Sequence, residues 1–333
     1  MGSHLKISVA MCTYNGEKYV EDQIRSILAQ TREVDEIVVG DDGSSDGTVR
    51  EAEGALRKSR AAWRVIRNEK NLGYRKNFEN VIRHTTGDVV FLCDQDDVWL
   101  PEKVETMMAA MESDPSCLMA FSDAYVTDAK LQIQRGSQWD AACYTENRPR
   151  FPDMMDLLLS GYYVTGACAC IRRDLFERCS DFSEIWIHDG WLAVHAALYG
   201  TLTPVPEKLL YYRQHGDNQI GARADSSPLA WAQNKWEVLR GGADKQLALH
   251  RDSRDRWKEF YALHRDEMPL RRKRQIARAV RVHADLCRLP RLPRAARLRM
   301  IAKYWTDGSY LAYYRRGRGC MLADLLFLLQ EGG

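Results

Sequence analysis

Residues 88–101 read DVVFLCDQDDVWLP and form the most informative stretch of this 333-residue sequence. A strand-like run, 88–93, leads directly into the acidic cluster Asp94-Gln95-Asp96-Asp97. Three carboxylates within four residues would repel one another strongly in the absence of a cation. A hard divalent ion such as Mg²⁺ or Mn²⁺, itself chelated by a diphosphate, would remove that repulsion. A solvated acidic turn that caps a helix at Pro101 is the alternative interpretation.

Upstream of this cluster, strand-like runs alternate with amphipathic stretches. Strands are expected at 5–11, 36–40 and 65–67, and helices at 18–30, 48–60 and 75–84. Such alternation predicts an α/β fold with a mostly parallel sheet covered by helices on both faces. In these sheets, ligands bind outside the carboxyl ends of the strands. Because the polar clusters 12–15, 41–44 and 94–97 each follow a strand, three strand ends are expected to converge on one crevice.

The cluster at 41–48, DDGSSDGT, follows the second strand and has two interpretations. A carboxylate at that strand end can accept a hydrogen bond from N3 of uracil or thymine, which cytosine does not offer. The alternative is a turn rich in Asp, Gly and Ser, in which Ser45 or Asp46 caps the next helix.

The regular alternation loosens after Asp123, and residues 124–152 are expected to form a long irregular connection. A second apolar block at 162–171 and a closing strand at 209–212 follow. From Pro228 onward the pattern is helical and rich in Arg, with breaks at Pro269, Pro290 and Pro293.

Several segments in the first half of the chain, taken together, resemble the family 2 glycosyltransferases in order and spacing. They are 10–16 (AMCTYNG), 30–31 (QT), 41–48 (DDGSSDGT), 71–77 (NLGYRKN), 87–88 (GD) and 94–97 (DQDD). Within that family the sequence is most similar to the bacterial rhamnosyltransferase-like branch. That similarity rests on 94–101 (DQDDVWLP), 165–166 (TG), 188–189 (HD) and 212–218 (YRQHGDN), and the match extends over residues 5–225.

The resemblance implies a GT-A fold, a nucleoside-diphosphate sugar donor, a divalent cation, Mg²⁺ or Mn²⁺, and inversion at the anomeric carbon. It predicts a catalytic domain at 5–225, in which 5–100 bind the nucleotide sugar and metal and 101–225 form the acceptor side. Residues 226–333 would form a helical, Arg-rich C-terminal region. The donor-binding residues it implies are Thr13, Tyr14, Asn15, Asp42, Lys76, Asp96 and Arg213.

Individual roles follow from matched motif positions. Tyr14 would stack on the base and Asp42 would accept from its N3. Asp96 would lie near the ribose and the metal, and Asp97 would be the main metal ligand. Lys76 matches a position near the donor, although a solvated helix residue is the alternative.

Asp189 matches the position of the family's general base, which takes the proton of the acceptor hydroxyl. An Asp that caps the following helix is the alternative, and both roles can coexist. His188 is assigned to the acceptor side. Trp186 and Trp191 flank the base and could form an apolar platform for the acceptor sugar or belong to the core.

Arg213 and His215 follow the expected closing strand. An Arg fork fits phosphate oxygens, and a neutral His can ligate the metal or donate to the leaving diphosphate. The resemblance leaves the choice between these two roles of His215 open. For a lone His, an ordinary loop residue is the alternative.

The donor and acceptor are expectations from the same resemblance. The best interpretation is transfer of rhamnose from dTDP-rhamnose to a polysaccharide or an O-antigen chain on a lipid carrier, and a UDP-hexose donor is the alternative. A nucleotidyltransferase is disfavoured because a Gly-rich basic loop is missing after the first strand. A non-catalytic carbohydrate- or nucleic-acid-binding protein is the rival from another class, suggested by the basic C-terminal part.

Charge is distributed unevenly along the chain. The formal net charge is +2, but residues 251–320 hold 20 Lys or Arg against 7 Asp or Glu, roughly +13. Apolar residues between these cations favour an anionic membrane surface over nucleic acid, so 271–320 are expected to bind lipid and no nucleic acid partner is expected. The alternative is that these helices pack on the catalytic domain or on a second subunit and that the arginines form a solvated face. With nine irregularly spaced cysteines and no apolar run of spanning length, the chain is expected to be cytoplasmic, peripheral at the inner face of the bacterial membrane.

Overall fold

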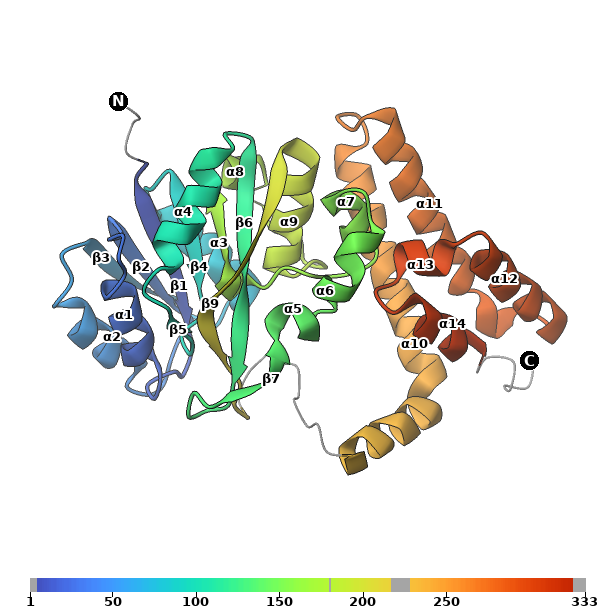
Figure 1. Ribbon diagram of the computed structural model, residues 1–333, viewed down its shortest axis with the longest axis horizontal. Helices are drawn as coiled ribbons and strands as arrows, with labels where there is room; N and C mark the ends of the chain where they lie inside the picture. Colours follow the sequence, from blue (N-terminus) through green and yellow to red (C-terminus); the bar gives the residue numbers. More distant parts are fainter. Residues whose placement is uncertain (1–4, 180, 217–227, 326–333) are drawn as a thin grey trace. The chain divides into compact units, whose positions relative to one another are not determined.

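The computed structural model describes residues 5–179, 181–216 and 228–325, which form two compact units (Figure 1). One unit comprises residues up to 146 and 163–222, and the other comprises 147–162 and the residues from 223 onward. The expected boundary between residues 225 and 226, and residues 217–218 of the YRQHGDN motif, lie outside the described residues.

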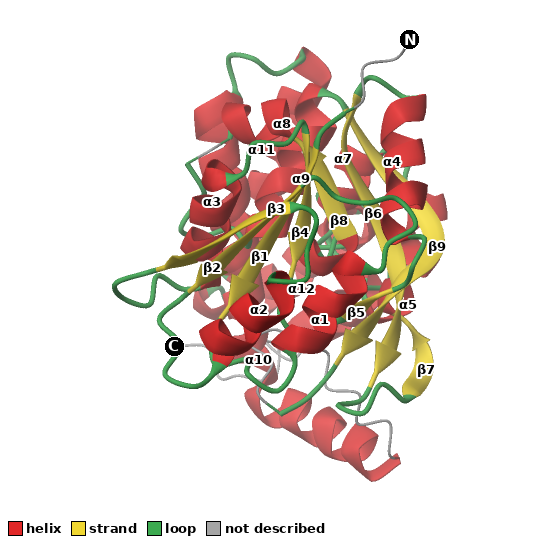
Figure 2. Ribbon diagram, turned by 90° about the vertical axis from the view of Figure 1, so that its left-hand side faces the viewer, coloured by secondary structure: helices red, strands yellow, loops and turns green. Residues whose placement is uncertain are grey.

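The first unit is built on one mixed sheet, whose strands are drawn in yellow in Figure 2. Its strand order is β3-β2-β1-β4-β8-β6-β9-β5, with β7 paired to β6. The strands are β1 (Ile7–Thr13), β2 (Glu36–Asp41), β3 (Ala62–Arg67), β4 (Val89–Cys93), β5 (Val98–Trp99), β6 (Cys117–Thr127), β7 (Ile133–Ser137), β8 (Ala169–Arg172) and β9 (Thr201–Arg213). The pairs β1–β2, β1–β4 and β2–β3 are parallel, so the predicted parallel α/β arrangement of the first half is confirmed.

Helices cover both faces of this sheet. They are α1 (Val20–Leu28), α2 (Thr48–Leu56), α3 (Tyr74–His84), α4 (Lys103–Ser113), α5 (Gln138–Ala141), α6 (Tyr144–Asn147), α8 (Arg173–Arg178) and α9 (His188–Tyr199). One apolar core joins α1, α2 and α4 to the sheet, and α3 and α9 contact each other on the opposite face. Because both faces are covered, every residue of β1, β2 and β4 is buried.

Gly40 allows α3 to lie directly on β2. A Cβ atom at this position would be 2.0 Å from Cγ2 of Val81 and 2.9 Å from Oδ1 of Asn77, both on α3. The Asn77 amide donates to the Gly40 carbonyl at 2.8 Å. The close approach of helix and strand therefore depends on the missing side chain.

The expectation of an irregular connection at 124–152 is wrong for much of its length. β6 continues to Thr127, β7 pairs back on it, and α5 and α6 follow. β6 is buried along nearly its whole length between β8 and β9, so its sequence lacks the alternation that marks a half-exposed strand.

The second unit is helical. It contains η1 (Arg148–Arg150), α7 (Met154–Leu158), α10 (Pro228–His264), α11 (Leu270–Leu286), η3 (Leu289–Arg291), α12 (Arg294–Thr306), α13 (Ser309–Tyr313) and α14 (Gly317–Leu325). Residues 147–162 belong here, whereas the sequence analysis assigned them to the acceptor side. The physical reason is charge pairing: Arg272 lies 2.7 Å from Asp153 and 3.3 Å from Asp156, which begin α7.

The predicted helix breaks at prolines are confirmed, because Pro269 and Pro293 directly precede α11 and α12 and Pro290 lies in η3. Among the described residues, no helix has the length and apolar character needed to cross a membrane.

Replacing Gly40 with Ala is expected to destabilise the first unit by about 1–3 kcal/mol, because the added methyl group overlaps Val81. Gly54→Ala is the matched control, since nothing lies within 4 Å of its Cβ position in α2, and Ala is favoured in a helix. Thermal unfolding of both variants tests this expectation. Equal melting temperatures would show that α3 adjusts at no cost.

Candidate active site

The loop after β1 and the acidic loop after β4 are joined by a reciprocal amide pair. The Tyr14 N–H donates to Gln95 Oε1 at 2.8 Å, and Gln95 Nε2 donates to the Tyr14 carbonyl at 3.0 Å. A Cβ atom on Gly16 would lie 2.1 Å from Gln95 Oε1, so a side chain at this position would displace the amide from its place beside Tyr14. The Tyr14 ring itself is 40% exposed and available for stacking. Gln95 is not among the site residues expected from the sequence, although its place between Asp94 and Asp96 was the available signal.

Thr13 and Asn15 connect the β1 loop to the loop after β2. The Thr13 hydroxyl donates to Asp41 at 3.1 Å and is buried. Asn15 has a positive φ of 49°, and its side-chain oxygen accepts from the Ser45 N–H at 2.9 Å. Both residues therefore have loop-forming contacts, and direct contact with the donor stays a prediction for them.

Asp42 is buried at the end of β2 and organises the segment before α3. Its Oδ1 accepts from the Leu72 N–H at 2.7 Å and from the Asn68 amide at 2.9 Å, and its Oδ2 accepts from the Gly73 N–H at 2.8 Å. A carboxylate offers about four acceptor positions. One position on Oδ2 is left for a further donor such as the N3–H of a base.

The carboxyl groups of the acidic loop are buried to different degrees, and Asp97 is the most deeply buried of them. Asp97 is 1% exposed, and its Oδ1 accepts from the Arg213 N–H at 2.9 Å. Burial, followed by repulsion from Asp96 and Asp94, raises the pKa of Asp97 well above its ordinary value. The pKa of Asp94 is raised to about 7 by burial, then by Asp96 and Asp189.

The second carboxylate oxygen of Asp97 is suited to binding a cation. Among the described residues this buried Oδ2 has no hydrogen-bond partner, and such an oxygen is costly unless a cation or proton compensates it. In the same part of the chain, no group of three His, Cys, Asp or Glu side chains is arranged to hold a metal. A divalent ion would therefore take one or two carboxylates from the protein and its other ligands from the diphosphate and water, which suits Mg²⁺.

Metal ligation by Asp97, Asp96 and His215 together stays a prediction, and two of these side chains contact each other directly. Nε2 of His215 lies 2.8 Å from Oδ2 of Asp96, so the two side chains bond to each other. The imidazole also stacks on Tyr19, with ring centroids 4.6 Å apart. His215 orients Asp96 in this arrangement.

Arg213 is 5% exposed and binds protein groups around the acidic loop. Its guanidinium donates to the Asp96 carbonyl at 2.8 Å and the Ala129 carbonyl at 3.0 Å, and it lies 4.8 Å from the centroid of the Tyr19 ring. The Arg213 guanidinium, which was expected to bind phosphate oxygens, therefore donates largely to protein groups. These contacts indicate that Arg213 positions the acidic loop.

Asp189 lies in the first turn of α9 and faces the same acidic region. Its Oδ2 accepts from the Gly166 N–H at 2.9 Å and its Oδ1 from the Gly190 N–H at 2.6 Å. Burial raises the pKa of Asp189 to about 6. A carboxylate with that pKa is ionised near neutral pH and basic enough to accept a proton, as a general base requires.

His188, next to it, is neutral. It is 8% exposed, and burial lowers its pKa to about 3. Its ring stacks on Phe78, with centroids 4.2 Å apart, and lies edge-on to Tyr74. Neither imidazole nitrogen has a hydrogen-bond partner within the described residues. Sequence analysis missed the aromatic contacts from α3, because 110 residues separate the partners in the chain.

Three other predicted residues have contacts that point to structural roles. Trp186 and Trp191 are 2% and 3% exposed with ring centroids 6.2 Å apart, so the core alternative fits them and the sugar platform does not. Lys76, which lies in α3, donates to Glu79 of the same helix at 2.9 Å and to the Phe182 carbonyl at 3.2 Å.

Lys103, which sequence analysis also missed, supplies a positive charge close to the acidic loop. It is completely buried, donates to the Ala167 carbonyl at 2.5 Å and lies 4.1 Å from the centroid of the Trp99 ring. Its charge lowers the pKa values of Asp94 and Asp97 and so partly offsets their desolvation.

A Rossmann-like sheet with acidic and aromatic loops at its strand ends defines the GT-A class of glycosyltransferases. Residues 8–180, more than half of the chain, match the family model described as Glycosyl transferase family 2. The chain belongs to that family and is a nucleotide-sugar-dependent glycosyltransferase.

Two relatives illustrate the match. The chain is 29% identical over 236 residues to an uncharacterized glycosyltransferase of Nostoc sp., covering 67% of this chain and 69% of that protein. It is 25% identical over 240 residues to the dTDP-rhamnosyl transferase RfbG of Shigella flexneri, covering 68% of this chain and 80% of that protein.

Solved structures share the fold. The mannosyltransferase PcManGT from Pyrobaculum calidifontis, in complex with GDP-Man and Mn²⁺, aligns with a TM-score of 0.56 at 16% identity over 98% of this chain and 86% of that chain. S. aureus TarS 1–349, in complex with UDP-GlcNAc, aligns with a TM-score of 0.53 at 17% identity over 97% and 90%. At these identities the likeness concerns the fold.

Gln95→Leu is expected to weaken donor binding by about tenfold or more, because the variant leaves the Tyr14 N–H and carbonyl without partners and loosens two loops of the site. Titration with nucleotide sugar measures the change. Gln134→Leu, at an exposed position of β7, is the control and should bind as the wild type does. Unchanged affinity in Gln95→Leu would remove this amide pair from the donor site.

Proposed function

We propose that this enzyme is an inverting, divalent-cation-dependent glycosyltransferase in which Asp189 is the general base. The observation that carries the proposal is the buried Asp189 carboxylate with a pKa of about 6. It interacts electrostatically with Asp94 of the acidic loop, which also contains the unpartnered oxygen of Asp97. A proton acceptor and a cation ligand of this kind are the two groups that displacement of a diphosphate requires.

In the proposed reaction, Tyr14 stacks on the base of the donor and Asp42 accepts its N3–H. Asp97, with Asp96 beside it, would hold the cation, which neutralises the charge developing on the departing diphosphate. Asp189 takes the proton from the acceptor hydroxyl as that oxygen bonds to the anomeric carbon and the bond to the diphosphate breaks. Arg213 and His215 keep the acidic loop in position.

For the donor we propose dTDP-rhamnose, supported by the similarity to the rhamnosyl transferase of Shigella flexneri. Asp42 would accept equally from N3 of thymine or uracil, so a UDP-hexose is the alternative. The proposed acceptor is a hydroxyl of a polysaccharide or O-antigen-type chain on a lipid carrier. That acceptor would be met at the inner face of the bacterial cytoplasmic membrane, to which the enzyme binds peripherally.

A panel of nucleotide sugars, each tested with and without Mn²⁺ or Mg²⁺, identifies the donor by thermal stabilisation. Binding stabilises the folded state by about 2.7 kcal/mol at 100-fold over Kd, so the correct donor stands out. dTDP-rhamnose is expected to give the largest metal-dependent shift, and a larger shift with a UDP-hexose would favour the alternative. Release of nucleoside diphosphate then separates an enzyme from a binding protein.

Asp97→Ala is expected to abolish turnover and metal-dependent donor binding while the protein stays folded, because the variant removes a cation ligand together with a buried, unpartnered oxygen. Calorimetry of Mn²⁺ and donor binding provides the measurement. Asp266→Ala, which removes an exposed carboxylate of the helical unit, is the control. Wild-type metal-dependent affinity in Asp97→Ala would show that the cation binds elsewhere.

Asp189→Asn should retain donor affinity and lose roughly 10²- to 10⁴-fold in kcat, the usual contribution of a general base. The base acts when ionised, so the kcat of the wild-type enzyme should rise with pH through about 6, the pKa of Asp189. Any residual rate of the variant should lack this rise. A variant with poor donor affinity and little change in kcat would instead make Asp189 a binding residue.

A further inference from the structure

The basic segment 271–320 divides into two parts with different surroundings. In α11, Arg271 and Arg272 pair with Asp153 and Asp156 of the same unit, at distances between 2.7 and 3.5 Å. The apolar residues Ile276, Ala279, Val282 and Leu286 of this helix are buried. Two of the four cations at the start of α11 are therefore paired within the unit, and the apolar face of this helix is covered.

The stretch 286–306 contains six Lys or Arg residues and no Asp or Glu. One of the six, Arg297, is completely buried and donates to the carbonyls of Leu292 at 2.6 Å and Pro290 at 3.0 Å. This guanidinium fixes the turn η3 against α12, so its charge serves the fold. The other five lie on the surface or near it.

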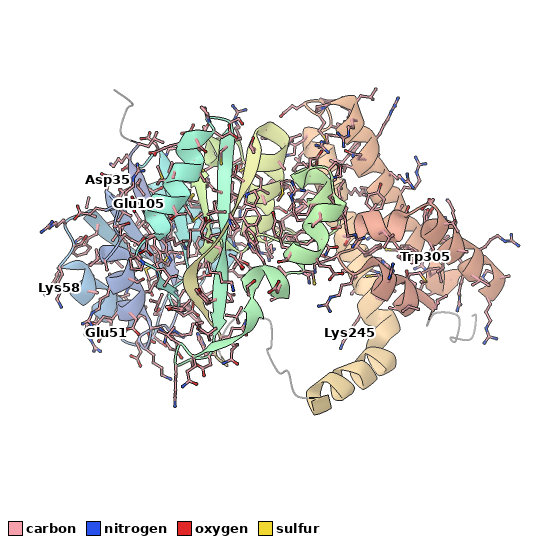
Figure 3. The ribbon with its side chains drawn as sticks, viewed as in Figure 1. Asp35, Glu51, Lys58, Glu105, Lys245 and Trp305 are labelled. Carbon is pink, nitrogen blue, oxygen red and sulfur yellow. The ribbon has the colours of Figure 1, made fainter. Side chains whose placement is uncertain are left out.

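The outer face of α12 carries an apolar stripe. Ala295, Leu298, Ala302 and Trp305 follow one another at spacings of three and four residues and are all exposed. Leu298 is 53% exposed and Trp305, labelled in Figure 3, is 38% exposed. The opposite face, formed by Arg297, Ile301 and Tyr304, is buried within the unit.

Cations border this stripe on both sides. At 100° per residue, Arg294 lies at one edge of the stripe, and Arg299 and Lys303 lie at the other. All three are exposed, and within the described residues none of them pairs with a carboxylate. Asp307, which ends the helix, is paired with Arg278 at 3.3 Å.

We propose that this outer face of α12, bordered by Arg294, Arg299 and Lys303, docks the enzyme on an anionic phospholipid surface. Leu298 and Trp305 would enter the boundary between headgroups and acyl chains, and the three cations would meet lipid phosphates around them. An indole suits that boundary because its ring is apolar and its N–H is polar. The inference deepens the proposed function, because it rests on that function for the acceptor on a lipid carrier.

The three cations and the apolar stripe together favour an anionic lipid surface as the partner of this face. A nucleic acid backbone would need the cations but would leave Leu298 and Trp305 in water. A second copy of this face would bring Arg294, Arg299 and Lys303 against the same cations, and the stretch offers no carboxylate to pair with them. An anionic lipid surface satisfies both parts of the face.

Sedimentation of the full chain with vesicles tests the proposal. The wild type should sediment with vesicles of phosphatidylcholine and phosphatidylglycerol and remain in solution with phosphatidylcholine alone. Leu298→Ser with Trp305→Ser should weaken binding by about tenfold or more. Arg294→Gln with Arg299→Gln and Lys303→Gln should weaken it by on the order of 100-fold at low salt, and the wild-type affinity should fall as salt is added.

Two matched variants control for lost apolar surface and lost charge. Leu263→Ser changes a leucine that is 59% exposed at the end of α10, and Arg57→Gln with Lys58→Gln and Arg60→Gln removes three exposed cations from the first unit. Both should bind vesicles as the wild type does. Equal binding by the α12 variants and these controls would overturn the proposal. A dimer that the Leu298 and Trp305 substitutions abolish, or a nucleic acid complex that the Arg294, Arg299 and Lys303 substitutions abolish, would also overturn it.

Release of nucleoside diphosphate from the donor, measured without vesicles, keeps the two proposals apart. Every α12 variant should release it at the wild-type rate, because none of the substituted residues lies in the candidate active site. A chain that binds vesicles but releases no diphosphate from any donor contradicts the proposed function. A chain that turns over donor and ignores anionic vesicles contradicts the docking face.

Discussion

Three carboxyl groups follow β4 within four residues; Asp97 is buried, and Asp94 is partly exposed. Burial and mutual repulsion both oppose their ionisation, so the surrounding chain has to hold them in place. The buried Lys103 offsets part of the charge, and the backbone of Arg213 donates to Asp97. Among the residues that the structure describes, the buried Oδ2 of Asp97 has no hydrogen-bond donor, and a cation bound with the diphosphate would compensate its charge.

The need to hold these carboxyl groups in place explains why so many polar side chains around the strand ends bind protein groups. Gln95 fixes the acidic loop to the backbone of Tyr14, and Arg213 fixes it to the carbonyl of Asp96. Asp42 holds the segment before α3 through two backbone N–H groups. A preorganised site of this kind has little reorganisation to undergo when charge develops on a leaving group, which favours catalysis.

Near the acidic loop, the adjacent residues Asp189 and His188 show how burial changes the pKa of a carboxyl group and of an imidazole in opposite directions. Both side chains are 8% exposed, and desolvation disfavours the charged form of each. The pKa of the Asp189 carboxyl is therefore raised, and the pKa of the His188 imidazole is lowered, so the imidazole is neutral. One residue is thereby suited to accepting a proton and the other to lying against the aromatic face of Phe78.

The sequence by itself determined the parallel half of the sheet, the placement of the acidic loop at a strand end and the family. These features depend on local periodicity and on motifs within short segments. Tertiary structure alone decided that His215 bonds to Asp96, that Trp186 and Trp191 are buried, and that Lys103 lies close to the acidic loop. It also decided that Arg272 pairs with Asp153 while Arg299 stays exposed. The physical reason is that a residue's charge and shape are local, whereas its partners and its access to water depend on how the whole chain packs. His215 and Asp96, for example, are 119 residues apart in the sequence.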